Sequence, residues 1–166
     1  MTSVLGTILL VAVVVVLAAT VTVFALDLGE STQPKAPVIQ VSHDFVPDGG
    51  ERTVAVTLEG GEAVRTDRLS VVASRPIDIG GPPGSATPAD ERWASSRETF
   101  TESSGSNPPQ VGIGDTWAAG ETVYLDPRGS VTDVTIDIYW NTRPVDGINP
   151  GTPQGETSYR IAEIEL

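Results

Sequence analysis

The apolar positions divide the chain into an N-terminal run without charge and a longer part in which apolar and polar residues alternate. Residues 4–26 are almost wholly apolar, and no ionisable side chain precedes Asp27. A helix of this length would extend about 35 Å, enough to cross a bilayer core of about 30 Å. The valines at 13–16 favour a strand in water, but in lipid an isolated strand leaves its amide groups unpaired. The run therefore predicts a helix.

A second pattern, of short apolar runs separated by turn residues, begins at residue 38. In the clearest run, residues 134–140, apolar side chains alternate with Thr, Asp and Tyr, as in a strand with one buried face. The predicted strands are 38–45, 54–58, 69–73, 121–125, 134–140 and 162–166. Many short strands without helical periodicity predict antiparallel sheets in a β-sandwich-like arrangement. The fold class is therefore α+β, with a long apolar N-terminal α-helix followed by an all-β outer domain.

The residues that end each pattern give the domain boundaries. Gly29 suits a helix terminus, and Pro34 and Pro37 lack the amide hydrogen that a continuing helix requires. We expect an apolar helix at 1–28, a linker at 29–37 and a β domain at 38–166.

Two segments of the β domain are rich in Gly, Pro, Ser and Thr and poor in apolar residues: 80–109 and 143–156. Such composition predicts long exposed loops, which on a rigid scaffold either carry recognition or form a passive solvated surface. Trp93 lies in the first loop, where it either contacts a neighbouring surface or is partly buried under the loop. Trp140 ends an alternating strand and is expected in the core, with Trp117 beside it.

The charge lies almost entirely on the β domain. The formal net charge is −12, and Lys35 is the only lysine among ten basic residues. Phosphate contacts need clustered Lys and Arg, so this composition argues against nucleic-acid binding. Acidity of this kind serves ordinary solubility or indicates a halophile, since high salt screens the repulsion between carboxylates. The scarcity of lysine favours the second interpretation.

The sequence carries no signature of catalysis or of a cofactor, and no catalytic, cofactor or metal residues are predicted. The chain has no cysteine and one histidine, His43, which excludes disulfides and the usual zinc sites. Ser42 and Asp44 flank His43, but neighbours on a strand point to opposite faces and would not form a catalytic triad. Acidic residues near Asp44, Asp48 and Glu51, or near Asp126, could hold a structural calcium ion, although neither place has EF-hand spacing.

Small residues gather on one broad side of the predicted helix, where they would let a second helix approach closely. They are Ala12, Ala18, Ala19, Thr22 and Ala25. Three interpretations of the helix stay open: a cleaved secretory signal, a single-span anchor, or a helix that first lies in the membrane and then packs in a filament core. A signal peptide has a basic start and a small-residue cleavage site, and neither is evident here.

Residues Thr2 to Ala12 resemble the start of haloarchaeal type IV pilins. In that family the mature chain opens with a Ser-Pro-Val-Ile-Gly-type motif and continues as a Val/Ala/Leu-rich helix. Here Thr2 and Ser3 stand at the serine and proline, and Val4-Leu5-Gly6 follow in register. No basic leader precedes the motif, so either the sequence starts close to the processing point or the start lies upstream. Gly112 to Thr122 also resembles a glycine-bracketed segment of these proteins.

The resemblance implies a structural subunit of a surface filament used in adhesion, and not an enzyme. It also implies self-assembly through the helix, at Gly6 and the small residues above, a membrane-inserted stage, and processing by a prepilin peptidase and a pilus assembly machinery. One alternative is a single-span anchored extracellular binding module that does not polymerise. A third, a membrane-tethered hydrolase, would need a cleft with paired acids that the sequence does not reveal.

Overall fold

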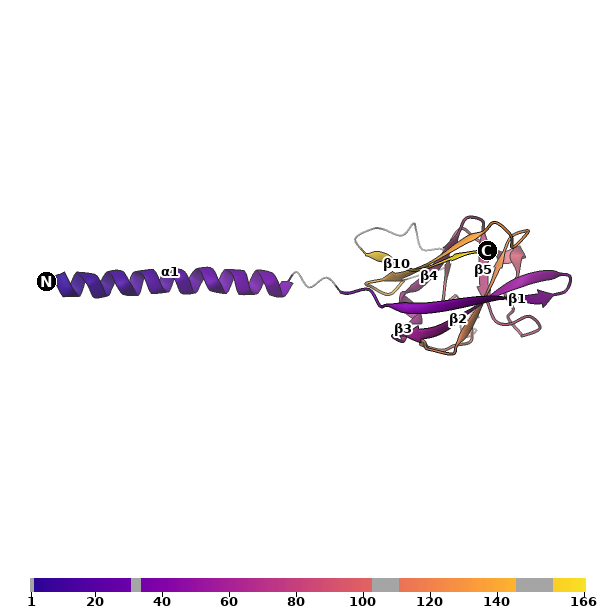
Figure 1. Cartoon of the computed structure of the whole chain (residues 1–166), viewed down its shortest axis with the longest axis horizontal. Helices are drawn as coiled ribbons and strands as arrows, with labels where there is room; N and C mark the ends of the chain where they lie inside the picture. Colours follow the sequence, from indigo (N-terminus) through magenta and orange to yellow (C-terminus); the bar gives the residue numbers. More distant parts are fainter. Residues whose placement is uncertain (1, 31–33, 103–110, 146–156) are drawn as a thin grey trace. The chain divides into compact units, whose positions relative to one another are not determined.

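The computed structural model describes residues 2–30, 34–102, 111–145 and 157–166, and the chain forms two compact units, Met1–Lys35 and Ala36–Leu166 (Figure 1). The first unit contains helix α1, Thr2–Glu30, whose side chains are described as far as Ala19. The predicted apolar helix is confirmed, and α1 continues two residues past the predicted end at 28. The second unit is built from antiparallel strands, so the predicted α+β class is confirmed as well.

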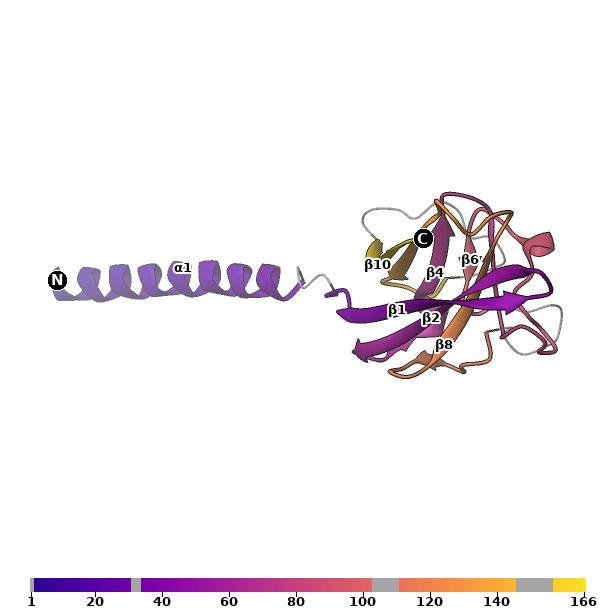
Figure 2. The same ribbon diagram turned by 45° about the vertical axis from the view of Figure 1, so that its right-hand side comes forward.

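Two four-stranded sheets form the β unit (Figure 2). The first has the order β1 (Ile39–Asp48), β2 (Glu51–Gly61), β8 (Thr122–Pro127), β5 (Ile77–Gly80). The second has the order β10 (Ser158–Glu165), β9 (Thr135–Asn141), β4 (Leu69–Ala73), β6 (Glu98–Thr99). A small two-stranded sheet pairs β3 (Val64–Arg65) with β7 (Thr116–Trp117), and 3-10 turns occur at Thr66–Arg68 (η1) and Glu91–Trp93 (η2). All the strands that the sequence predicted are present, β4 with the same bounds.

The core lies between the two sheets. It combines alternate residues of β2, such as Val54 and Val56, with alternate residues of β9, such as Ile136 and Ile138, and all four are fully buried. This is the arrangement expected when two sheets pack through the apolar faces of alternating strands. Aromatic rings complete the core: the rings of Trp117 and Phe100 have centroids 5.3 Å apart, and those of Trp140 and Tyr159 are 6.1 Å apart.

The sheets end in four edge strands, β1 and β5 in the first and β10 and β6 in the second. The pairing of β1 with β2 shifts register between Gln40 and Val41, and the pairing of β10 with β9 shifts between Arg160 and Ala162. Arg160 also forms ion pairs with Asp137, at 3.1 Å, and with Glu163. Bulges of this kind bend and twist a strand locally.

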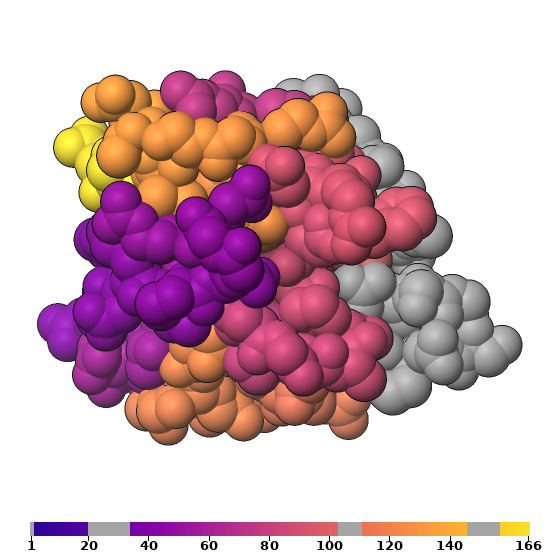
Figure 3. All heavy atoms as spheres, turned by 90° about the vertical axis from the view of Figure 1, so that its right-hand side faces the viewer, coloured from indigo at the N-terminus to yellow at the C-terminus, as the bar shows by residue number. Residues whose placement is uncertain are grey.

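The predicted loop at 80–109 is more ordered than its composition suggests. Its described part, residues 80–102, contains η2 and β6 and buries several side chains, among them those of Ala89, Glu98 and Phe100. Backbone hydrogen bonds between Ile77 and Ser95, at 2.8 and 3.0 Å, attach this segment to the free edge of β5. On the face shown in Figure 3 the segment lies beside the β1–β2 hairpin. The second predicted loop falls largely at 146–156, outside the described residues.

Candidate functional site

The described part of helix α1, Thr2 to Ala19, presents an exposed apolar surface. Every described side chain from Thr2 to Ala19 is exposed, and the large ones include Leu5 and Leu9, each 70% exposed. Because water-exposed apolar surface costs free energy in proportion to its area, this helix requires apolar surroundings. A helix that is apolar on all sides is typical of a membrane span or of the interior of a larger assembly. By length and composition, Thr2–Ala19 is able to cross a membrane.

The residues predicted for helix packing all belong to α1. Gly6, Ala12, Ala18 and Ala19 are exposed, so their small side chains are accessible to another helix, while the side chains of Thr22 and Ala25 lie outside the described ones. A Cβ added at Gly6 would meet nothing within 4 Å, so nothing inside the chain requires a glycine there.

The hydroxyl of Thr7 is satisfied within the helix. It donates to the carbonyl oxygen of Val4 at 2.9 Å, or to that of Ser3 at 3.2 Å. An unpaired hydroxyl in an apolar medium would cost several kcal/mol. The single polar side chain between Val4 and Ala19 is therefore compatible with both lipid and a packed helix bundle.

Trp93 is presented at the surface of the β unit by the η2 turn. Its side chain is 75% exposed, so the alternative of burial under the loop does not hold. Asp90 caps the turn by accepting a hydrogen bond from the Arg92 amide at 3.0 Å, and its carboxylate also pairs with the Arg92 guanidinium. The indole therefore extends from a turn whose backbone is fixed at its start.

Two buried carboxylates hold the η2 turn against the first sheet. Asp78 on β5 and Asp126 on β8 are cross-strand neighbours. Asp78 accepts a hydrogen bond from the Asp90 amide and Asp126 accepts one from the Glu91 amide, each at 2.7 Å. Glu91 in turn accepts from the Gly129 amide at 2.7 Å. The turn is thus attached to the sheet through amide–carboxylate bonds, which are stronger than bonds between neutral groups.

A glycine lets the segment that carries the turn lie close to β5. At Gly80, the last residue of β5, an added Cβ would approach the Ala89 nitrogen to 2.4 Å. Real Cβ atoms do not come this close to backbone atoms, so only glycine allows this packing.

Burial changes the acid–base behaviour of these anchoring carboxylates. Asp78 is 1% and Asp126 is 7% exposed. Burial raises the pKa of each to about 6, opposed by the hydrogen bond from the turn amide. The neighbouring negative charges of Glu91, Glu51 and Asp48 add to the increase in the pKa of Asp126. Both groups therefore titrate near neutral pH, well above an ordinary aspartate.

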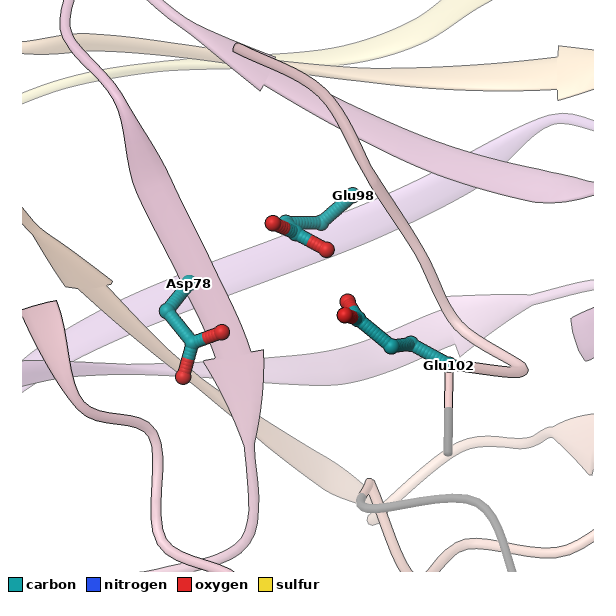
Figure 4. A group of neighbouring side chains, drawn as sticks. All are labelled: Asp78, Glu98 and Glu102. Carbon is teal, nitrogen blue, oxygen red and sulfur yellow. The ribbon is translucent and has the colours of Figure 1, made fainter. Parts of the chain in front are cut away.

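Asp78 also belongs to a group of three carboxylates at one edge of the sandwich. One oxygen from each of Asp78, Glu98 and Glu102 lies within 4.8 Å of the others, and the side chains point toward a common space (Figure 4). Burial, together with the charge of Asp78, raises the pKa of Glu102 to about 7. No local sequence pattern predicts this group. Its members are 20 and 4 residues apart and lie in no motif.

The residues considered for catalysis or calcium at the sequence level are placed differently. His43 is exposed on β1, where its ring meets that of Phe45 at 6.1 Å in an edge arrangement. The Ser42 hydroxyl donates to the Glu59 carboxylate, so it is engaged away from His43. Of the acids near Asp126, Asp48 and Glu51 influence its pKa. Within the described residues, however, the group with cation-ligand spacing is Asp78, Glu98 and Glu102.

Comparison with known proteins gives a match for the N-terminal part of the chain. Residues 1–41 match the family model for the N-terminal region of archaeal type IV pilins. The matched region takes in all of α1 and the first residues of β1. A search of the curated proteins gives no match to this chain.

Proposed function

We propose that this chain, whose residues 1–41 match the N-terminal region of archaeal type IV pilins, is a structural subunit of a type IV pilus-like filament on the cell surface. The helix would first lie in the membrane and then pack against copies of itself in the filament core. A prepilin peptidase and a pilus assembly machinery would act on it before assembly. The β unit would face outward from that core.

The observation that carries this proposal is the exposed apolar surface of α1. All its described side chains are exposed, those of Ala12 and Ala19 among them, and its Thr7 hydroxyl is bonded internally. Such a helix can move from lipid to a protein interior without exposing an unpaired polar group. Association would be directed by close approach through Ala12, Ala18 and Ala19, because apolar side chains gain little from helix contact over lipid contact.

Adhesion is the task we propose for the outer unit, with Trp93 as a contact residue. The indole is exposed beside Arg92, on a turn fixed by three carboxylate–amide hydrogen bonds. An exposed aromatic ring held in one place binds a surface with little loss of side-chain entropy. The acidic composition of the unit fits a protein that works in high salt.

The alternative is a single-span anchored module that binds at the surface without polymerising. It would use the same helix and the same Trp93 turn, so the two functions differ in what packs against α1. A bulky residue on the small-residue side should block helix–helix contact, whereas a lone span in lipid would accept it.

The test compares Ala19→Leu with Val13→Phe, which adds bulk on the opposite side of α1. Each variant replaces the native protein in cells, and filaments sheared from the cells are imaged by electron microscopy while the membrane fraction is blotted. We expect all proteins in the membrane, filaments from the native chain and from Val13→Phe, and none from Ala19→Leu. Filaments from Ala19→Leu would refute the small-residue contact. A native chain that occurs only in membranes, with no fibre, would favour the anchored module.

A further inference from the structure

The three carboxylates Asp78, Glu98 and Glu102 meet where the two sheets come together at one edge. Asp78 comes from β5, the end strand of the first sheet. Glu98 comes from β6, the end strand of the second sheet, and Glu102 follows shortly after it. Figure 4 shows the three carboxyl groups converging from these elements. The cluster therefore joins parts of the chain that belong to different sheets.

The burial of Glu98 distinguishes this cluster from an ordinary group of surface acids. Its side chain is buried, with the residue 1% exposed, and its Oε2 atom has no hydrogen-bond partner. Its Cα pairs with that of Val71, a core residue of β4, so Glu98 lies beside the apolar interior. Glu102 also has a buried Oε2 without a hydrogen-bond partner. A buried carboxylate oxygen without a partner is costly, and a bound cation is one of the few groups that compensate it.

One oxygen of Asp78 and the guanidinium of Arg97, the basic neighbour of Glu98 in the sequence, both make hydrogen bonds outside the cluster. One carboxylate oxygen of Asp78, Oδ2, accepts the hydrogen bond from the Asp90 amide. Arg97 precedes Glu98 on the chain, and its guanidinium donates to the Ser70 hydroxyl at 3.0 Å. Neighbours along an extended chain point to opposite sides, which places the Arg97 and Glu98 side chains on different faces.

The ligand chemistry selects the class of ion. All the available ligand atoms are carboxylate oxygens, which suit hard cations and not the thiolate- or imidazole-binding metals. Each of the three residues offers one carboxylate oxygen to the common space, and water would complete the shell. Calcium accepts six to eight oxygens in irregular geometry, whereas magnesium requires a near-ideal octahedron. Three carboxylates that come from separate backbone positions do not form an ideal octahedron, so they fit calcium better than magnesium.

We propose that Asp78, Glu98 and Glu102 bind one calcium ion that links β5 to β6 and so fastens the two sheets together at this edge. Burial raises the pKa of both Asp78 and Glu102, and the charge of Asp78 adds to the increase at Glu102, as expected for buried carboxylates that have no cation beside them. Because Asp78 also holds the Asp90 amide, the ion would stabilise the turn that presents Trp93. This binding concerns the single subunit, so its test is independent of filament assembly.

The experiment uses the full chain in detergent, treated with a chelator and then dialysed against high salt. Calcium binding is measured by equilibrium dialysis with radioactive calcium, and the unfolding temperature of the β unit is followed by tryptophan fluorescence. The variant is Glu102→Gln, because this partly exposed residue can be changed with little effect on folding. The matched control is Asp126→Asn, which removes a buried carboxylate next to Asp78 but outside the cluster.

We expect the native chain and Asp126→Asn to bind one calcium ion and to unfold at a higher temperature with calcium than with equal magnesium. Glu102→Gln should bind calcium about tenfold or more weakly, with an unchanged circular dichroism spectrum. Absence of saturable binding by the native chain would overturn the proposal. Equal binding by the native chain and Glu102→Gln would also overturn it, because it would show that calcium adsorbs to the acidic surface in general.

Discussion

Asp126→Asn tests whether the carboxylates beneath the η2 turn oppose folding at neutral pH. Asparagine keeps the side-chain oxygen that accepts the Glu91 amide hydrogen but removes the negative charge. The pKa of Asp126 is raised to about 6 by burial, from an ordinary aspartate value of about 4. In the unfolded chain this group loses its proton near pH 4, whereas in the folded chain it keeps the proton until about pH 6.

The sign and size of the effect follow from this difference. Folding stability associated with Asp126 is fully present below about pH 4 and is lost as the pH rises through about 6. A difference of this size corresponds to roughly 3 kcal/mol once both states are ionised. The new amide hydrogens need acceptors in the same place, which reduces the gain. We therefore expect Asp126→Asn to raise the free energy of unfolding by about 1–3 kcal/mol at about pH 8.

The assay is denaturant unfolding of the full chain in detergent, with chelator present, followed by tryptophan fluorescence. All three tryptophans lie in the β unit, so the signal reports that unit. Native chain and variant are compared at about pH 5 and about pH 8, and the advantage of the variant should grow between these values. A variant that is less stable than the native chain by the same amount at both pH values would refute the reasoning. It would show that the ionised carboxylate stabilises the turn by more free energy than the burial of its charge costs.

Further substitutions address the packing and exposure of the same region. Gly80→Ala should destabilise the β unit by about 1–3 kcal/mol, since the new Cβ collides with the Ala89 backbone. Gly60→Ala is its control in the same denaturation assay, because a Cβ there meets its nearest neighbour at an ordinary 3.8 Å, and equal losses in the two variants would contradict the collision. Trp117→Ala should cost about 3–5 kcal/mol through the cavity left in the core, and a cost below about 1 kcal/mol would place the ring outside it. Trp93→Ala should change stability by less than about 0.5 kcal/mol but reduce attachment of cells to a surface in a washing assay, and unchanged attachment would remove Trp93 from the proposed contact.

The elements with long, regular patterns could be predicted from the sequence. The uninterrupted apolar run gave α1, and the alternation at 134–140 gave β9, because burial of one face imposes a period of two on a strand. Strands β3, β6 and β7 contain two residues each, too few to show any period. Strand β5 was not predicted, because Pro76 precedes it and Asp78 stands between its apolar residues. Proline and aspartate together are typical of a turn.

The carboxylate cluster could not have been predicted, and the reason is topological. Asp78 and Glu98 come together because β5 and β6 end different sheets that pack face to face. No local pattern predicts which strands will lie at the edge of a sheet, since strand order depends on pairing between distant parts of the chain. The buried position of Glu98 follows from its pairing with β4, and in the sequence it looks like any other acid of an acidic loop. For Trp93 the sequence left two roles open, contact with a neighbouring surface and partial burial under the loop; its exposure shows that the burial was wrong, and the contact stays a prediction.

The way the sheet edges are protected matters where many copies of the β unit are crowded together. A filament would hold many identical β units at very high local concentration, and an open strand edge can pair with the same edge of a neighbour to form a cross-β aggregate. β1 and β10 each carry a bulge, β1 contains Pro47, and β10 carries Arg160 and two glutamates. The edge of β5 is covered by the Ser95 segment. In the proposed filament, these features would let subunits stand side by side at high density while lateral sheet growth is blocked, and self-association would be left to the helix.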